Sequence, residues 1–149
     1  MSDRQPYTIA AHASESEREA VCRAALCVVW PDLSWLDIDM AALPGDAQTD
    51  AAVDALQSYR TKSLLSRRLT ETAHVVPGRD DAALDAVLHL AGKTIGSTGL
   101  AASDARIIYD VNDSGTSCVF HLTDDQRDEV LRALRDQRMR EQVLISWRG

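Results

Sequence analysis

The sequence of 149 residues lacks the features that would place a protein in a membrane or in an oxidising compartment. No apolar run approaches the roughly 20 residues that a membrane-spanning helix needs. The N-terminal stretch, MSDRQPYTIAAHASESE, lacks the apolar segment of a secretory signal peptide. The cysteines number three, and an odd number argues against a disulfide framework. We therefore expect a protein of the cytoplasm that does not bind a membrane.

Complete catalytic and nucleotide-binding motifs are also missing. Gly92-Lys93-Thr94 looks like the end of a phosphate-binding loop, but that loop needs a glycine where the sequence has Val87. The Cys-x-x-Cys and Gly-x-Ser-x-Gly patterns do not occur. Cys118 and His121 are an odd number of positions apart, so on a strand they point to opposite faces. We expect no cofactor and no catalytic cysteine.

The strongest structural pattern covers residues 105–147. Apolar residues alternate in 106–111 and in 117–122, which is typical of strands, and Asn112-Asp113-Ser114-Gly115 favours a tight turn between them. Thr123 and Gln126 then form the capping box of a helix. This stretch predicts a β-hairpin, a helix and a last strand around Val143, Ile145 and Trp147. Its core face is predicted to contain Ile107, Tyr109, Val111, Cys118, Phe120 and Leu122.

The rest of the chain predicts further helices and strands. Ser14 with Glu17 predicts a capped helix over residues 15–29, whose face rich in Ala and Val is buried. The other expected elements are a strand at 7–11, a strand or alternatively a short helix at 35–40, a helix from Asp50 to Leu69 capped by Thr49, a strand at 71–76, a helix from Asp80 or Asp81 to Gly92, and a loop over 93–104.

These elements predict the α+β (mixed α/β) class. We expect residues 1–149 to form one domain, a sandwich of a mixed sheet and about four helices. The C-terminal unit is expected to be a hairpin, a helix and a strand. Residues 1–6 are expected to form a flexible tail.

The charge of the chain is unevenly distributed. Residues 1–57 contain ten acidic and three basic side chains, whereas residues 58–149 contain thirteen of each, so the net charge of −7 belongs to the first segment. Such asymmetry is typical of a surface for a basic partner, although exposed helix faces of any acidic protein carry carboxylates too. The candidate partner-binding residues are Glu15, Glu17, Glu19, Asp37, Asp39, Asp46, Asp50 and Asp54.

Two classes of function remain open at this point. The first is a non-enzymatic interaction module that binds a basic protein, as inhibitors, immunity proteins, antitoxins and chaperones do. The second is a small enzyme or a domain that binds a small molecule or a metal, in which Asp37 and Asp39 meet a histidine (His12, His74 or His121). Nucleic acid is not expected as a partner, because Arg132, Arg135, Arg138 and Arg140 stand among acidic residues without interleaved aromatic side chains.

Overall fold

The structure, a computed structural model, describes residues 3–149. It contains four α-helices and eight strands, joined in places by short 3₁₀ turns. In chain order the elements are β1 (Gln5–Ile9), α1 (Glu15–Val29), β2 (Leu33–Asp39), α2 (Ala47–Ala55), β3 (Arg60–Lys62), β4 (Leu69–Val75), α3 (Leu84–Leu90), β5 (Gly96–Ala101), β6 (Ile107–Asn112), β7 (Ser117–Leu122), α4 (Asp124–Asp136) and β8 (Leu144–Ser146).

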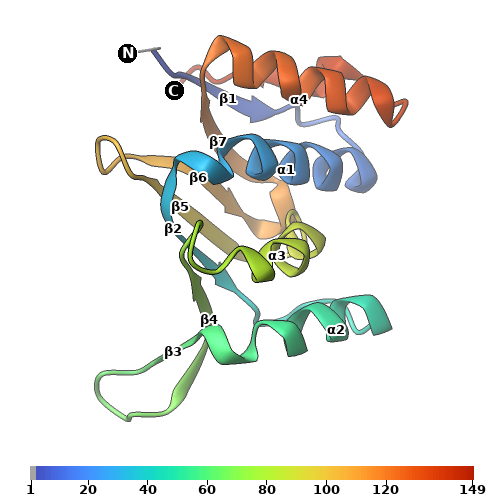
Figure 1. Cartoon of the computed structure of the whole chain (residues 1–149). Helices are drawn as coiled ribbons and strands as arrows, with labels where there is room; N and C mark the ends of the chain where they lie inside the picture. The colour runs from blue at the N-terminus through green and yellow to red at the C-terminus, as the bar shows by residue number, and fades with distance from the viewer. Residues whose placement is uncertain (1–2) are drawn as a thin grey trace.

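The elements form two layers in a single-domain α+β fold (Figure 1). One layer is an eight-stranded sheet with the order β3-β4-β2-β5-β6-β7-β1-β8. The helices cover one face of it in the order α4, α1, α3, α2. The predicted class is confirmed, but the sheet differs from the expected mixed sheet, because all the strand pairings of residues 3–149 are antiparallel. Short hairpins join β3 to β4 and β5 to β6 to β7, and a hairpin can only join antiparallel strands.

The two capping boxes that the sequence predicts, at the starts of α1 and α4, are present. Ser14 accepts a hydrogen bond from the backbone N–H of Glu17 and the Glu17 side chain accepts one from that of Ser14, so α1 begins with a capping box. Thr123 and Gln126 form the same arrangement at the start of α4. Both caps satisfy backbone donors that a helix leaves unpaired in its first turn. Within residues 3–149, no helix is long and apolar enough to cross a bilayer.

The core lies between the helix layer and the sheet. Tyr109 and Phe120 are paired across β6 and β7, their ring centroids are 5.5 Å apart, and both are fully buried. The Tyr109 hydroxyl donates a hydrogen bond of 3.2 Å to the backbone oxygen of Cys22 on α1, which gives this polar group a partner inside the core. Cys118 is buried on the same face of the sheet, as predicted.

The helix predicted from Asp50 to Leu69 is wrong beyond residue 55. Helix α2 covers Ala47–Ala55, and its N-cap is Asp46 rather than the predicted Thr49. The buried hydroxyl of Thr49 instead donates a hydrogen bond to the Asp46 carboxylate. Residues 60–75 then form the β3–β4 hairpin, which projects from the lower end of the molecule (Figure 1). Leu64 and Leu65 fall within the predicted helix but lie in the connection of this hairpin.

The loop predicted over residues 93–104 contains strand β5, which fills the centre of the sheet between β2 and β6. Its small side chains hid the alternation: Ser97, Gly99 and Ala101 are buried while Thr98 and Leu100 are half-buried. A Cβ atom on Gly99 would lie 2.9 Å from Leu33 Cδ2, so the close packing at this position suits glycine.

The predicted hairpin of β6 and β7 is confirmed, but one predicted core residue of β6 is exposed. Ile107 was predicted to be buried but is 47% exposed, and Ile108 is fully buried instead. Gly99 pairs with Tyr109 and Leu100 pairs with Ile107, so Ile108 is one extra residue in β6. Such a β-bulge shifts the alternation by one position, which periodicity alone does not reveal.

The two ends of the chain also differ from expectation. Gln5 and Pro6 belong to β1, so the expected flexible tail of residues 1–6 is wrong for these positions, and residues 1–2 lie outside the described part. Arg4 is anchored by hydrogen bonds to Asp32 and Gln126. The last strand pairs with β1, which lies between it and β7.

Candidate functional site

The predicted acidic residues do not share one surface. Asp37 and Asp39 lie on β2 with side chains on the sheet face that no helix covers, whereas the other six belong to α1 and α2 on the opposite face. The eight carboxylates therefore cannot meet one partner surface together. Each group has to be considered separately.

Two of the six carboxylates on the helix side are used inside the protein. Arg140 donates two hydrogen bonds to Glu17, of 2.6 and 2.8 Å, and Glu17 is only 7% exposed. These bonds, together with the cap at Ser14, lower the pKa of Glu17 to about 2. Lys93 forms an ion pair of 3.2 Å with Glu19. Both residues tie α1 to neighbouring segments.

Four exposed carboxylates belong to the adjacent helices α2 and α3 or to the cap of α2, and we call Asp46, Asp50, Asp54 and Asp85 the acidic surface. Asp46 accepts hydrogen bonds from the Thr49 backbone and hydroxyl, which lower its pKa. Asp50 and Asp54 are one helical turn apart on the exposed side of α2. None of the ion pairs found among residues 3–149 involves any of the four. Asp85 was not predicted, because residues 58–149 are neutral as a whole and the sequence does not show that α3 packs beside α2.

The uncovered sheet face brings Asp37 together with one histidine. Asp37 and His74 are paired across β2 and β4, and Asp37 Oδ1 lies 2.5 Å from His74 Nδ1. The ring centroid of Trp35 lies 5.8 Å from that of His74. Both side chains of the pair are about two-fifths exposed, at 40% for Asp37 and 39% for His74. Of the three histidines considered from the sequence, His74 is the one that contacts Asp37.

The other members of that predicted site do not contact the Asp37–His74 pair, although Asp39 shares the face of β2 with Asp37. Asp39 accepts a hydrogen bond from the backbone N–H of Ala41, and His12 is exposed in the turn after β1. His121 lies on β7, and partial burial, followed by the nearby Arg106 and Arg4, lowers its pKa. Within residues 3–149, no three His, Cys, Asp or Glu side chains gather as a metal site would require. The Asp37–His74 pair can orient the imidazole ring and leaves Nε2 to meet an external group.

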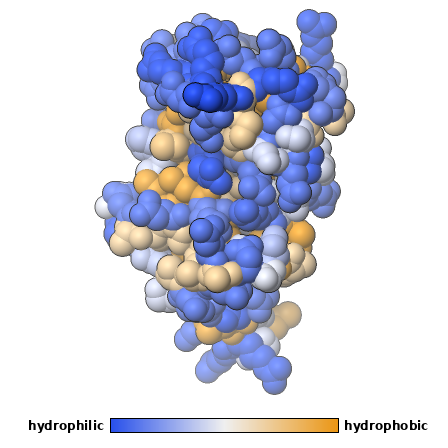
Figure 2. Space-filling model, turned by 90° about the vertical axis from the view of Figure 1, so that its right-hand side faces the viewer, coloured by the Kyte–Doolittle hydropathy of each residue, from blue (hydrophilic) through white to orange (hydrophobic). Residues whose placement is uncertain are grey.

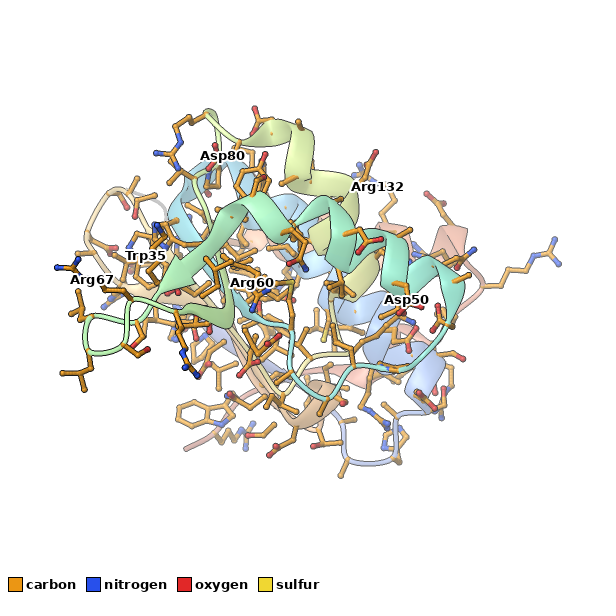
Figure 3. All side chains as sticks on the ribbon, turned by 90° about the horizontal axis from the view of Figure 1, so that it is seen from below. Trp35, Asp50, Arg60, Arg67, Asp80 and Arg132 are labelled. Atoms are coloured by element: carbon orange, nitrogen blue, oxygen red, sulfur yellow. The ribbon has the colours of Figure 1, made fainter. Side chains whose placement is uncertain are left out.

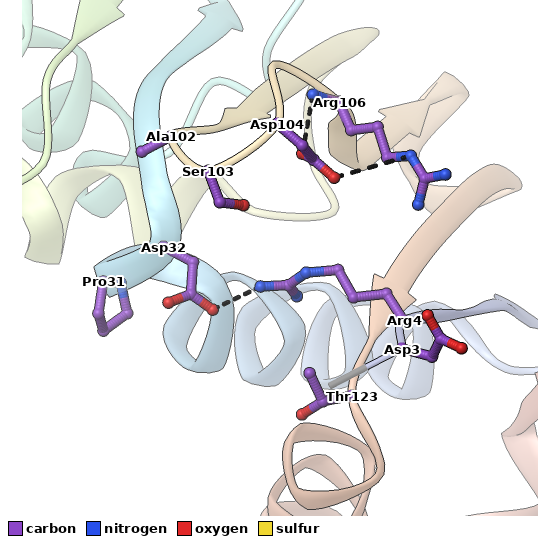
Figure 4. Close-up of a pocket in the computed structure, with 9 residues that line it drawn as sticks. All are labelled: Asp3, Arg4, Pro31, Asp32, Ala102, Ser103, Asp104, Arg106 and Thr123. Atoms are coloured by element: carbon purple, nitrogen blue, oxygen red, sulfur yellow. Dashed lines mark hydrogen bonds and ion pairs between the residues drawn. The ribbon is translucent and has the colours of Figure 1, made fainter. Parts of the chain in front are cut away.

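A surface hollow of about 850 Å³ lies where the N-terminal segment, the turn after α1 and the β5–β6 loop meet (Figure 4). Arg4 points across it and donates 2.6 Å hydrogen bonds to Asp32 and to Gln126, and a third bond to the backbone oxygen of His121. Asp104 and Arg106 on the opposite wall form a second pair. Because Arg4 binds acceptors within the protein, this hollow is organised by a structural ion pair.

The end of the β3–β4 hairpin is a feature that the sequence did not predict. Leu64 and Leu65 are each 99% exposed, and Leu69 is 50% exposed. Three exposed bases, Lys62, Arg67 and Arg68, flank the leucines, and we call these six residues the leucine tip. In Figure 2, blue and orange side chains lie together at the lower end of the molecule, where Figure 1 places the hairpin.

Hydrogen bonds give the leucine tip a defined shape. Ser63 N–H donates to the Arg68 oxygen at 2.8 Å, and Arg67 N–H donates to the Ser63 oxygen at 3.0 Å. Arg67 has a left-handed backbone, with φ of 55°. Ser63 and Ser66 are residues that favour turns, and they were the indication of this hairpin in the sequence. The spacing of the leucines favoured a helix instead.

Comparisons with protein-family models, curated proteins and solved structures found no match to this chain.

Proposed function

We propose that the protein is a non-enzymatic interaction module that binds a basic protein partner through the acidic surface. The observation that carries this proposal is the set of exposed carboxylates of Asp50, Asp54 and Asp85, on two packed helices, without an ion pair among the described residues. Carboxylates without a neighbouring base project a negative potential that attracts a basic surface. Inhibitors, immunity proteins, antitoxins and chaperones are proteins of this kind.

The proposed contact set is narrower than the eight acidic residues of the sequence. It keeps Asp46, Asp50 and Asp54, adds Asp85, and leaves Glu15 at the exposed start of α1 as a peripheral contributor. Glu17 and Glu19 are excluded by their internal pairs with Arg140 and Lys93. Asp37 and Asp39 are excluded because they lie on the opposite face of the sheet.

The test combines capture with association kinetics. A protein captured from the native organism is purified, and its association rate is measured at about 50 mM and about 500 mM salt, which differ severalfold in Debye length. We expect an on-rate that falls with salt, and falls by about tenfold or more in the Asp50→Lys/Asp54→Lys variant, because opposed charge mainly speeds encounter. The variant should keep its melting temperature, since exposed charges contribute little to stability.

A matched control makes the same change of charge elsewhere. Glu129 and Asp136 are exposed on α4 and form no ion pair among residues 3–149. Glu129→Lys/Asp136→Lys should reduce the on-rate far less than the change on α2. An acidic partner, or equal effects of the two variants, would contradict the proposal.

A second candidate function is supported by the Asp37–His74 contact. Trp35, Asp37 and His74 offer a ring, a carboxylate and an imidazole nitrogen on the uncovered sheet face, a combination suited to a small polar ligand. A fragment screen by NMR tests this candidate: a true ligand shifts the Trp35 indole and His74 ring signals together, and loses its effect in Trp35→Ala. If no compound perturbs both signals, this candidate fails.

A further inference from the structure

We propose that two copies of the chain associate reciprocally, with the leucine tip of each copy bound to the acidic surface of the other. The exposure of the leucine tip is the first observation behind this proposal. Leu64 and Leu65 are both 99% exposed, so almost none of their apolar surface is covered within the chain. Soluble proteins seldom expose neighbouring large apolar side chains outside an interaction site.

The charges of the leucine tip indicate the kind of partner. Lys62, Arg67 and Arg68 form no ion pair among residues 3–149, although the chain as a whole carries a net charge of −7. The leucine tip is therefore a basic point on an acidic protein. A surface that complements it has exposed carboxylates beside apolar atoms.

The acidic surface of a second copy has this composition. Asp50, Asp54 and Asp85 supply carboxylates without an ion pair among the described residues. Half-buried Val53 is adjacent to Asp54 in the sequence, and half-buried Leu88 is three positions after Asp85. In the proposed contact the bases of the leucine tip meet the carboxylates, and the leucines cover the exposed part of Val53 and Leu88. The chain itself thus contains both halves of a complementary contact.

The positions of the two regions allow the contact to be made twice. The hairpin and α2 lie at the same end of the molecule, which faces the viewer in Figure 3, with Arg67 and Asp50 at opposite sides of that view. A two-fold axis through this end places the leucine tip of each copy over α2 of the other, which gives a closed dimer rather than a filament. Two reciprocal contacts also double the buried area, which brings a small tip closer to the roughly 1,200 Å² of a specific interface.

The dimer covers the acidic surface that the proposed function assigns to a basic partner. Self-association and partner binding then compete for the acidic surface, so this surface is covered in the dimer and exposed in the monomer. The dimer itself does not depend on the proposed function, and it is tested with the purified chain alone.

Sedimentation velocity on the full chain tests the proposal. Concentrations from about 10 µM to about 1 mM suit a contact at the lower end of interface sizes. We expect the sedimentation coefficient to rise with concentration and the dimer to dissociate as salt increases. Leu64→Ser/Leu65→Ser should weaken dimerisation at least tenfold, with an unchanged circular dichroism spectrum because both side chains are exposed.

Charge exchange between the two regions provides the decisive comparison. Arg67→Glu/Arg68→Glu and Asp50→Lys/Asp54→Lys should each be monomeric alone, and an equimolar mixture of the two should form a heterodimer. In that mixture the tip with reversed charge faces the α2 surface with reversed charge, and the natural tip faces the natural surface. Both contacts of the heterodimer then join opposite charges. Arg132→Glu/Arg148→Glu, a change of equal charge at exposed positions elsewhere, should dimerise as the natural sequence does. A natural chain that is monomeric at every concentration, or a mixture that stays monomeric, would overturn the proposal.

Discussion

Arg140 and Glu17 are joined by two hydrogen bonds of 2.6 and 2.8 Å, which connect the segment after α4 to the first turn of α1. The same Glu17 carboxylate accepts the Ser14 N–H that completes the helix cap. The Glu17 side chain therefore both caps the start of α1 and joins two segments that are more than 120 positions apart in the sequence. Paired side chains of this geometry are stronger than single contacts to a flexible charge.

This pair predicts a dependence of stability on pH. The folded protein lowers the pKa of Glu17 from 4.5 to about 2, so the carboxylate stabilises the fold above pH 4.5 and loses that effect as the pH falls toward 2. Glu17→Gln should melt at a lower temperature than the natural sequence at pH 7. The difference in melting temperature should close between about pH 4.5 and about pH 2.

Glu15→Gln is the matched control for that series. Glu15 lies in the same helical turn, is exposed and forms no ion pair within residues 3–149. Its melting temperature should stay close to that of the natural sequence at every pH. A constant difference for Glu17→Gln across the acid range would show that the charge of Glu17 is not what stabilises this contact.

Local signals explain what the sequence predicted well. The capping boxes at Ser14 and Thr123 and the turn at 112–115 each depend on residues a few positions apart, and all three are observed. The α+β class follows from such local elements, since each has one apolar face to bury.

Relationships between distant segments explain what the sequence did not predict. The Asp37–His74 contact depends on the register of β2 against β4, and the acidic surface depends on α3 packing beside α2. The sequence did not predict strand β5, because its buried residues Ser97 and Gly99 have no large apolar side chains. The close approach of the Leu33 side chain leaves room at position 99 only for glycine. The predicted helix ran through Leu64 and Leu65 because apolar spacing alone does not distinguish a buried helix face from an exposed hairpin end.

The packing of Phe120 predicts a large loss of stability on truncation. Phe120 is fully buried against Tyr109 at the centre of the sheet. Phe120→Ala should lower the free energy of unfolding by about 3–5 kcal/mol, because it removes apolar contacts and leaves a cavity. Urea unfolding followed by circular dichroism measures this change. Val119→Ala, on the half-exposed face of the same strand, should cost less than about 1.5 kcal/mol.

Gly99 and Gly45 predict opposite tolerance to a methyl group. A Cβ atom at Gly99 would lie 2.9 Å from Leu33 Cδ2 and 3.3 Å from Tyr109 Cβ, so Gly99→Ala should destabilise the fold by about 1–3 kcal/mol. Gly45 has no heavy atom within 4 Å of the same position, so Gly45→Ala should change stability by at most about 0.5 kcal/mol. Equal unfolding midpoints in urea for the two variants would refute the close packing of β5 against Leu33.

The three cysteines predict a simple pattern of thiol reactivity. Burial raises the pKa of Cys22 well above its usual value and also raises that of Cys118, so both thiols are protonated and inaccessible at neutral pH. Cys27, in contrast, is exposed on α1. A thiol reagent should therefore react promptly with one cysteine in the native protein and with all three in denaturant.

The variant Cys27→Ser should abolish the prompt reaction and leave the other two cysteines unlabelled until the protein unfolds. Because Cys27 is exposed, this substitution should not change the melting temperature, which provides the control for folding. The slow labelling of Cys22 and Cys118 then reports opening of the core between α1 and the sheet, and its rate should rise in Phe120→Ala. Prompt labelling of Cys118 in the native protein would instead place its thiol at an accessible, activated position, and the expectation that no cysteine is catalytic would have to be abandoned.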